Sequence, residues 1–190
     1  MNTDLFRTIE YLKDGTPVQQ YCYNTLTQLG IMEYLKPYDP ILAGTIPIEI
    51  DIESSDADII CHAPDLRQIQ EDVRKRYDSI SGFTDYISTG QYIASFTYNS
   101  LPVEIYAEDR PTLLQNGYRH MIVEYRILEL AGVAFKDEII RLKLSGYKTE
   151  PAFGKLLHLK EPYAGLFELS AMTDRQLSDF IRSATLQSFA

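Results

Sequence analysis

The stretch Leu42–Cys61, LAGTIPIEIDIESSDADIIC, decides the fold that we predict for this chain. A short apolar run ends in Gly44-Thr45, an acidic loop follows, and the segment resumes as a strand that carries Asp56 and Asp58. Because alternate side chains of a strand point to the same face, these two carboxylates are expected on one face, about 6–7 Å apart. Like charges at that distance repel each other, so the pair indicates a hard divalent cation with oxygen ligands.

A third carboxylate, Glu104, lies inside an otherwise apolar strand predicted over residues 101–107. If that strand lies beside the one that carries Asp56 and Asp58, the three carboxylates form a set that can hold one or two Mg²⁺ (or Mn²⁺) ions. Ions held in this way bind the phosphates of a nucleotide and activate a hydroxyl for in-line displacement. The alternative is an acidic turn beside a charged sheet edge, which only discourages aggregation.

The residues around this stretch predict an α+β fold. Apolar periodicity indicates a short helix within residues 1–15, a longer one over 17–36 and a third over 66–77. Strands are expected over 41–45, 57–62, 83–88, 92–98 and 101–107. Helices follow over about 116–131, 135–145, 150–159, 162–170 and 174–187. We therefore expect an α+β core over residues 1–110 and a helical C-terminal lobe over 111–190, packed on that core.

The composition of the chain limits the classes of substrate and the cellular location that we expect. The chain has 190 residues, a net charge of −9 and a pI of about 4.8, which argues against long nucleic acids, because these need a basic face. A small-molecule or protein substrate is favoured instead. The N-terminus lacks the features of a signal peptide, and no apolar run reaches the ~20 residues of a membrane span. Cys22 and Cys61 have no metal-binding spacing, and we expect buried free thiols in a cytoplasmic protein.

The spacing of these residues resembles a known signature. Gly44-Thr45, ten further residues and then DADI at 56–59 are similar to the signature of the nucleotidyltransferase superfamily, which has a polymerase-beta-like fold. The spacing resembles that of the minimal and the antibiotic nucleotidyltransferases, including a serine, Ser55, before the first aspartate. Many minimal members carry an arginine and a further glycine in the loop, where this chain has IPI at 46–48.

The resemblance implies roles for the candidate residues. Asp56, Asp58 and Glu104 would be both the metal ligands and the catalytic residues, and Glu104 would also be near enough to act as the base for the acceptor hydroxyl. Gly44 and Thr45 would contact the triphosphate of an NTP, the donor substrate. A glycine followed by a hydroxyl residue suits this task, because backbone N–H groups and an O–H can then approach phosphate oxygens. Ser55 would join them in binding the nucleotide.

Three longer segments resemble a bacterial domain-of-unknown-function family of the same superfamily, numbered 4269. They are GTIPIEIDIESSDADIIC (44–61), YRHMIVEYRIL (118–128) and KTEPAF (148–153). The resemblance covers most of residues 40–170 and implies a fold and a site, but no substrate.

Basic residues near these segments are further candidates. Arg119 and His120 at the start of the first C-terminal helix, and Lys148 between two helices, are expected to hold phosphate or the acceptor. The alternative for each is a surface charge or, for His120, a structural hydrogen bond.

The function that we expect is Mg²⁺-dependent transfer of a nucleoside monophosphate from an NTP to a hydroxyl of a small molecule or protein. Two alternatives stay open. The altered loop suggests a catalytically degenerate protein that binds nucleotide or metal without transfer. The acidic surface and the apolar helical tail suggest a partner-binding, antitoxin-like protein with the same fold. The sequence leaves the base, the acceptor and the oligomeric state open, because fold and function are separable.

Overall fold

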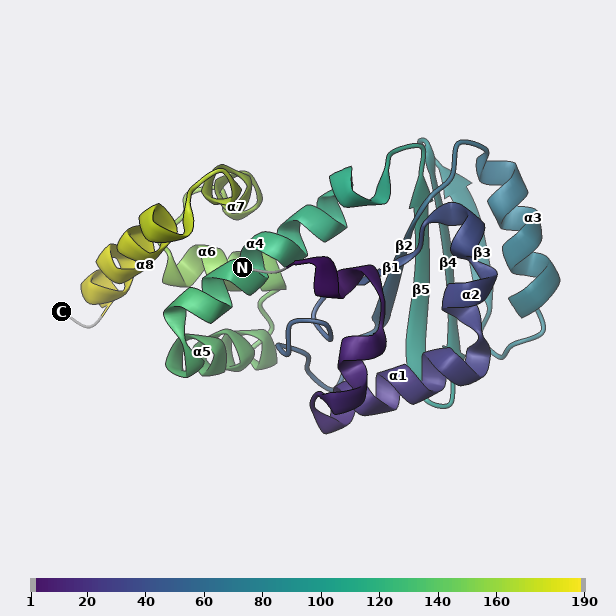
Figure 1. Cartoon of the computed structure of the whole chain (residues 1–190), viewed down its shortest axis with the longest axis horizontal. Helices are drawn as coiled ribbons and strands as arrows, with labels where there is room; N and C mark the ends of the chain where they lie inside the picture. The colour runs from purple at the N-terminus through teal and green to yellow at the C-terminus, as the bar shows by residue number, and fades with distance from the viewer. Residues whose placement is uncertain (1–2, 189–190) are drawn as a thin grey trace. The chain divides into compact units, whose positions relative to one another are not determined.

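The structure, a computed structural model, describes residues 3–188, with no side chains described beyond residue 185 (Figure 1). These residues form two compact units. The sheet unit comprises the chain up to Glu49 together with Ser55–Tyr118. The helical unit comprises Ile50–Ser54 and the chain from Arg119 onward. The α+β class predicted from the sequence is confirmed, because the chain combines one mixed sheet with flanking helices.

The sheet has five strands in the order β1-β2-β5-β4-β3. They are β1 (Ile41–Ala43), β2 (Ala57–His62), β3 (Thr84–Ser88), β4 (Gln91–Tyr98) and β5 (Leu101–Glu108). Strands β2 and β5 run parallel, whereas the other neighbours are antiparallel. This central parallel pair therefore places the strand that follows the acidic loop beside β5, which is the last strand in the sequence.

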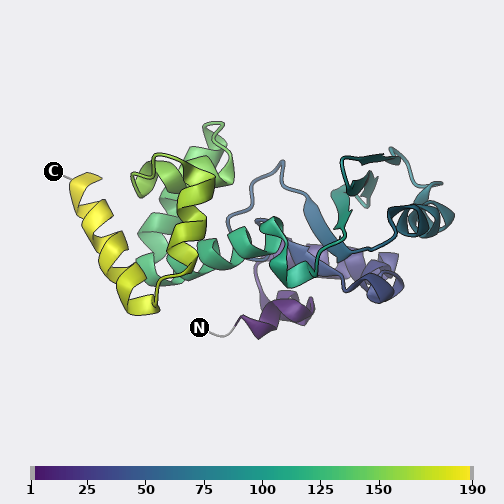
Figure 2. The ribbon, with the colours of Figure 1, turned by 90° about the horizontal axis from the view of Figure 1, so that it is seen from above.

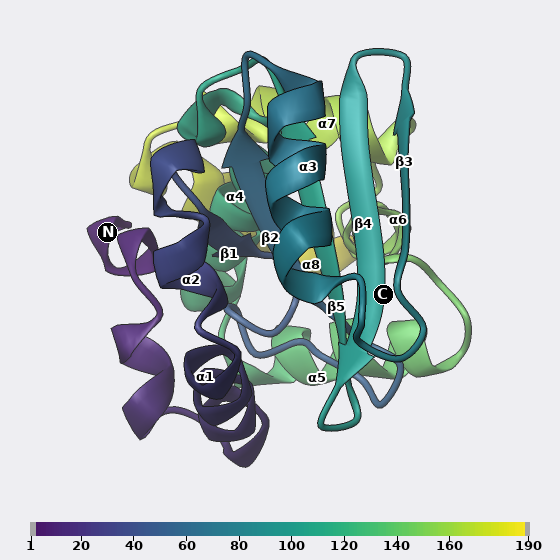
Figure 3. The same cartoon turned by 90° about the vertical axis from the view of Figure 1, so that its right-hand side faces the viewer.

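One face of the sheet forms the hydrophobic core. Its side chains alternate along β2 as Ala57, Ile59 and Cys61, and the matching residues of β4 and β5 are also buried. Helices α1 (Pro17–Leu29), α2 (Ile31–Tyr34) and α3 (Leu66–Tyr77) cover this face, as Figure 3 shows. Helix α3 runs along the strands, upright in Figure 1 and seen end-on in Figure 2. Asp58 and Glu104 alternate with the buried positions and so belong to the opposite face.

Local signals explain where these helices begin. Thr16 and Gln19 form a capping box at the start of α1, and Pro17 occupies its first turn. The Asp65 side chain accepts from the backbone N–H groups of Arg67 and Gln68 and caps α3.

The first 36 residues differ from the prediction in two places. The helix predicted over 17–36 ends at Leu29, because Gly30 is left-handed with φ of 67°, and the short α2 follows. The helix predicted within 1–15 is instead two 3₁₀ helices, Asp4–Arg7 and Glu10–Asp14. Isolated segments this short gain few α-helical hydrogen bonds, so the tighter 3₁₀ turn suffices.

The helical unit contains most of α4 (Asn116–Ala131), and then α5 (Val133–Leu144), α6 (Thr149–Leu156), α7 (Pro162–Ser170) and α8 (Asp174–Ser188). Arg126 of α4 donates to the carbonyl oxygens of Ser170 and Met172 and to the carboxylate of Asp174. One side chain thus ties α4 to the connection between α7 and α8. Among the described residues, no helix has the length and apolar composition that a membrane span requires.

The outer strand β3 is attached to α3 by one ionic contact. Arg74 donates to both oxygens of Asp85 at 2.8 and 2.9 Å, and Gln70 donates to the same carboxylate at 3.0 Å. The Asp85 side chain is only 7% exposed. Burial alone would raise the pKa of Asp85, but these donors lower it below its ordinary value. The carboxylate is therefore charged in the folded chain at neutral pH.

Replacing Asp85 with asparagine is expected to lower the free energy of unfolding at pH 7 by about 1–2 kcal/mol, because charge-assisted hydrogen bonds are lost. The half-exposed Arg74 regains water, which limits the loss. A lowered folded-state pKa gives stability above the unfolded pKa, and this is lost as the pH falls through the folded value. In urea unfolding, the difference between the two proteins should therefore shrink below about pH 4. The exposed Asp14→Asn change is the control, and a difference that persists at low pH would contradict the ionic origin.

Candidate functional site

Strand pairing brings two of the predicted carboxylates side by side. In the parallel register of β2 and β5, Asp58 lies directly opposite Glu104. On the far side of Asp58 is Ala43 of β1, and on the far side of Glu104 is Ser95 of β4. Neighbouring strands are about 4.8 Å apart. The two carboxylates therefore occupy the middle of a row that crosses the sheet on the face away from the hydrophobic core.

The third carboxylate, Asp56, immediately precedes β2 and is half-buried, like Asp58 and Glu104. Burial raises the pKa of Glu104, and the negative charge of Asp56 raises it further. Asp56 is therefore close enough to Glu104 for its negative charge to disfavour ionisation of the Glu104 carboxyl group. The three carboxylates predicted from the sequence are thus gathered at one place, and a cation there would relieve their repulsion.

The turn after β1 approaches these carboxylates closely. Gly44 has φ of 80°, and a Cβ atom at this residue would lie 2.1 Å from the Oδ2 atom of Asp58. Only glycine leaves room for the aspartate at this point. The hydroxyl groups of Thr45 and Ser55 share a hydrogen bond of 3.1 Å, which joins the two ends of the acidic loop. Gly44, Thr45 and Ser55 therefore lie beside the carboxylates, as three of the predicted binding residues.

The segment after Thr45 is a fixed turn rather than an open loop. Ile46 and Ile48 are almost fully buried. The Gln19 side chain, itself 3% exposed, donates to the carbonyl oxygens of Ile46 and Pro47 at 3.0 and 3.2 Å. The sequence identified Gln19 only as part of a helix, although its place in the capping box was readable. These buried apolar residues and the Gln19 hydrogen bonds thus anchor the turn.

The predicted basic residues belong to the helical unit. Arg119 stacks over the ring of Phe167 with 4.5 Å between the guanidinium and the ring centroid. His120 is buried on α4, and its ring meets Phe167 edge-on at 4.0 Å. Lys148 is exposed and occupies the N-cap position of α6. The described contacts of Arg119 and His120 are thus with aromatic residues of the helical unit, and Lys148 lies at a helix start. The roles of the three residues toward phosphate or an acceptor stay predictions.

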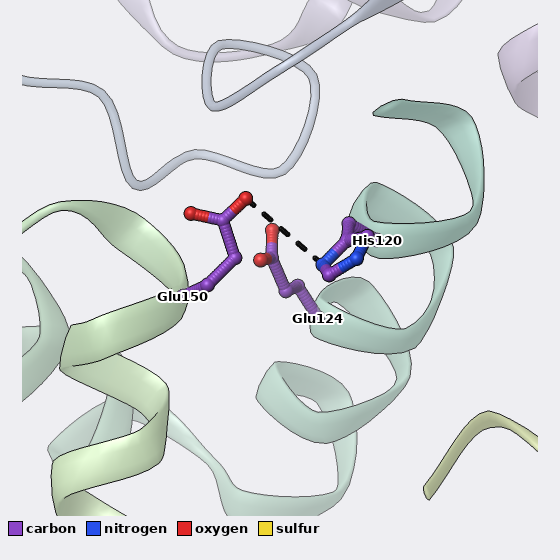
Figure 4. Close-up of side chains that lie close together, drawn as sticks. All are labelled: His120, Glu124 and Glu150. Atoms are coloured by element: carbon purple, nitrogen blue, oxygen red, sulfur yellow. Dashed lines mark ion pairs between the residues drawn. The ribbon is translucent and has the colours of Figure 1, made fainter. Parts of the chain in front are cut away.

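Sequence reasoning missed a second group of ionisable residues. His120 and Glu124 of α4 and Glu150 of α6 place a ligand atom each within 4.8 Å of one another (Figure 4). The spacing of His120 and Glu124, four residues apart on a helix with many apolar residues, was the available signal. Neither residue indicates its partner Glu150, because α6 begins in a separate part of the chain. Cys22 and Cys61, by contrast, are buried as predicted, and neither forms a disulfide within residues 3–188.

Comparisons with solved structures find distant likenesses. A chain of the polymerase core of TRAMP, an RNA surveillance complex, is 11% identical, with a TM-score of 0.48, and the match covers 93% of this chain. A cytoplasmic RNA terminal U-transferase is 14% identical, with a TM-score of 0.46, and the match covers 85% of this chain. The match spans 60% of the first of those chains and 48% of the second.

The comparison with curated proteins finds no match. The family described as "Domain of unknown function (DUF4269)" matches residues 24–169 of the 190, which includes β1, β2, β5 and both groups of ionisable residues. The match confirms the family resemblance drawn from the three sequence segments. This chain belongs to the DUF4269 family.

Proposed function

We propose that this protein is a nucleotidyltransferase that moves a nucleoside monophosphate from an NTP to a hydroxyl group of a small molecule or protein. The observation that supports this proposal best is the parallel register of β2 and β5, which sets Asp58 opposite Glu104, with Asp56 beside them. Three carboxylates at one place supply only hard oxygen donors. That set suits Mg²⁺ or Mn²⁺ better than a thiophilic metal.

The residues present fit such an ion. Asp56 and Asp58 would hold it, with Glu104 as a third ligand, and their repulsion in its absence is the expected mark of a cation site. A bound divalent ion would supply charge neutralisation and Lewis acidity to the phosphates. Gly44 keeps Asp58 in place by its lack of a side chain, and Thr45 and Ser55 offer hydroxyl groups beside it. The N–H and O–H groups of that turn would orient the triphosphate.

The transfer itself needs a base. The acceptor oxygen would attack the α-phosphorus of the NTP, its proton would pass to a carboxylate, and the bond to pyrophosphate would break. Glu104 is the residue that we assign to the proton, because it lies opposite Asp58 in the parallel register of β2 and β5, at the place where the acceptor hydroxyl would meet the ion. A carboxylate with a raised pKa accepts a proton more readily than an ordinary one.

Nucleotide binding provides the direct test. The four NTPs are added to the protein with Mg²⁺, with Mn²⁺ or with EDTA, and the thermal midpoint is measured against metal alone. One NTP is expected to raise the midpoint only when metal is present, and a ligand at 100 times its Kd stabilises the folded state by about 2.7 kcal/mol. Release of pyrophosphate is then followed with candidate hydroxyl acceptors. The absence of any metal-dependent NTP shift would contradict the proposal.

Binding without transfer is the second candidate function. The observation that favours it is the anchored turn, in which Gln19 and the buried Ile46 and Ile48 occupy the segment that carries arginine and glycine in minimal nucleotidyltransferases. A turn held in this way brings no basic side chain to a triphosphate. A metal-dependent NTP shift without pyrophosphate release from any acceptor would select this candidate over the first.

A further inference from the structure

The helical unit contains a buried cluster that the proposed transfer does not require. His120 and Glu124 lie one turn apart on α4, and Glu150 lies in the first turn of α6. Figure 4 shows the two glutamate carboxylates and the imidazole pointing toward one another across the space between these helices. The Nδ1 atom of His120 is 3.9 Å from an oxygen of Glu150, which is beyond hydrogen-bond distance.

Two polar atoms of this cluster are buried without a hydrogen bond. Glu124 is only 4% exposed to solvent, and His120 is 7% exposed. The Oε1 atom of Glu124 and the Nδ1 atom of His120 have no hydrogen-bond partner among the described residues. Leaving such groups unpaired is costly, so native proteins nearly always satisfy them. We therefore look for a ligand that both the Glu124 oxygen and the His120 nitrogen could bind.

The chemistry of the cluster indicates what that ligand is. Burial, together with the charge of Glu150, raises the pKa of Glu124 well above its ordinary value, although Lys143 opposes the shift. Burial also lowers the pKa of His120, which keeps the imidazole neutral. A metal ion would displace the proton that this raised pKa favours on Glu124. The neutral imidazole nitrogen and the carboxylate oxygens are then lone-pair donors that converge without hydrogen bonds between them, as around a metal ion.

The surroundings hold the imidazole in this orientation. Its ring packs edge-on against Phe167 at 4.0 Å and lies 5.9 Å from the ring of Tyr163. Lys143, the nearest buried cation, donates to the carbonyl oxygen of Ile50 at 2.6 Å. In tetrahedral coordination at about 2.0–2.2 Å, the donor atoms lie about 3.3–3.6 Å from each other. The ligand atoms here lie within 4.8 Å of one another, so the side chains would rotate inward to close on an ion.

We propose that His120, Glu124 and Glu150 bind a divalent transition-metal ion, with Zn²⁺ as the ion to test. One nitrogen and two carboxylate oxygens suit Zn²⁺ better than Mg²⁺, which prefers oxygen ligands alone. Three protein ligands leave a coordination position for water or a further ligand. The ion would fasten the first turn of α6 to α4. This site is made of other residues than the three carboxylates of the sheet and does not depend on the proposed nucleotidyl transfer.

The experiment measures Zn²⁺ binding in a protein in which two of the sheet carboxylates are replaced by uncharged amides. The Asp56→Asn/Asp58→Asn double variant is stripped with EDTA, dialysed and titrated with Zn²⁺ by calorimetry, and its thermal midpoint is followed in parallel. One Zn²⁺ per chain is expected, with a rise in the midpoint that EDTA reverses. Mg²⁺ at the same concentration is expected to give no such rise.

Three further changes in the same background locate the ion. Glu124→Gln and Glu150→Gln are each expected to weaken Zn²⁺ binding by at least about 100-fold, since the loss of an outer partner alone costs 10–100-fold. Glu150 is 25% exposed, so its variant tests the site even if the buried Glu124→Gln change disturbs folding. The control is Glu129→Gln, an exposed glutamate of the same helix, which should bind as before. Absence of Zn²⁺ binding, or binding that Glu150→Gln leaves unchanged, would overturn the proposal.

Discussion

Replacing Asp58 with asparagine is expected to abolish the proposed metal-dependent nucleotide binding and to lower the proposed nucleotidyl transfer by about 1,000-fold or more. Such a loss corresponds to about 4 kcal/mol of transition-state stabilisation. The physical reason is the position of Asp58 in the middle of the row, between Ala43 and Glu104. Asparagine keeps the shape of the side chain but removes the charge that would hold the ion, and amide nitrogen does not replace a carboxylate oxygen as a ligand for Mg²⁺.

The fold should survive this change. Asparagine keeps the shape of the side chain and removes one of three neighbouring negative charges, so the free energy of unfolding of the metal-free Asp58→Asn protein should stay within about 1 kcal/mol of the wild type. Urea unfolding in EDTA measures this quantity. The matched control is Asp109→Asn, because Asp109 follows β5 and its side chain is 70% exposed. Full activity in the Asp58→Asn protein would refute the metal assignment and the proposed transfer together.

Replacing Gly44 with alanine is expected to produce the second large effect. A left-handed φ costs a residue with a Cβ atom about 1–2 kcal/mol, and the new Cβ atom would meet the Asp58 carboxylate at 2.1 Å. Either the carboxylate turns away or the end of β1 shifts. We expect the free energy of unfolding to fall by about 2–4 kcal/mol in total and the metal-dependent NTP shift to disappear. Urea unfolding and the thermal assay of nucleotide binding measure the two effects.

Gly90 supplies the matched control for this prediction. It has the same φ of 80° in the turn between β3 and β4, but a Cβ atom there would meet nothing within 4 Å. Gly90→Ala should therefore cost only the backbone strain of about 1–2 kcal/mol and leave NTP binding intact. The difference between the two variants isolates the contact between Gly44 and Asp58. Equal losses of stability and unchanged nucleotide binding in both would show that this contact does not shape the site.

Local pattern was enough for much of the fold. The predicted bounds of β2, α3 and α7 agree with the structure, because each element has a clear periodicity and a turn, cap or proline at its ends. The strands predicted over 83–88, 92–98 and 101–107 agree with β3, β4 and β5 to within one residue at each end. The first 36 residues were predicted less well. Their apolar spacing continues through Gly30, whereas the backbone conformation at that glycine ends the helix.

The sequence by itself predicted that Asp56 and Asp58 point to one side of the chain, since alternation is a property of extended backbone alone. In the structure Asp58 belongs to β2 and Asp56 immediately precedes it. From the sequence, Glu104 could lie beside them only if its strand paired with the strand of Asp58. The tertiary structure decided this pairing, because the parallel register of β2 and β5 depends on contacts between distant segments and on the helices that bury the other face. The same holds for the approach of Gly44 to Asp58 and for the meeting of His120 and Glu124 with Glu150. Each is a contact between separate elements, and long-range packing sets such contacts where local propensity does not.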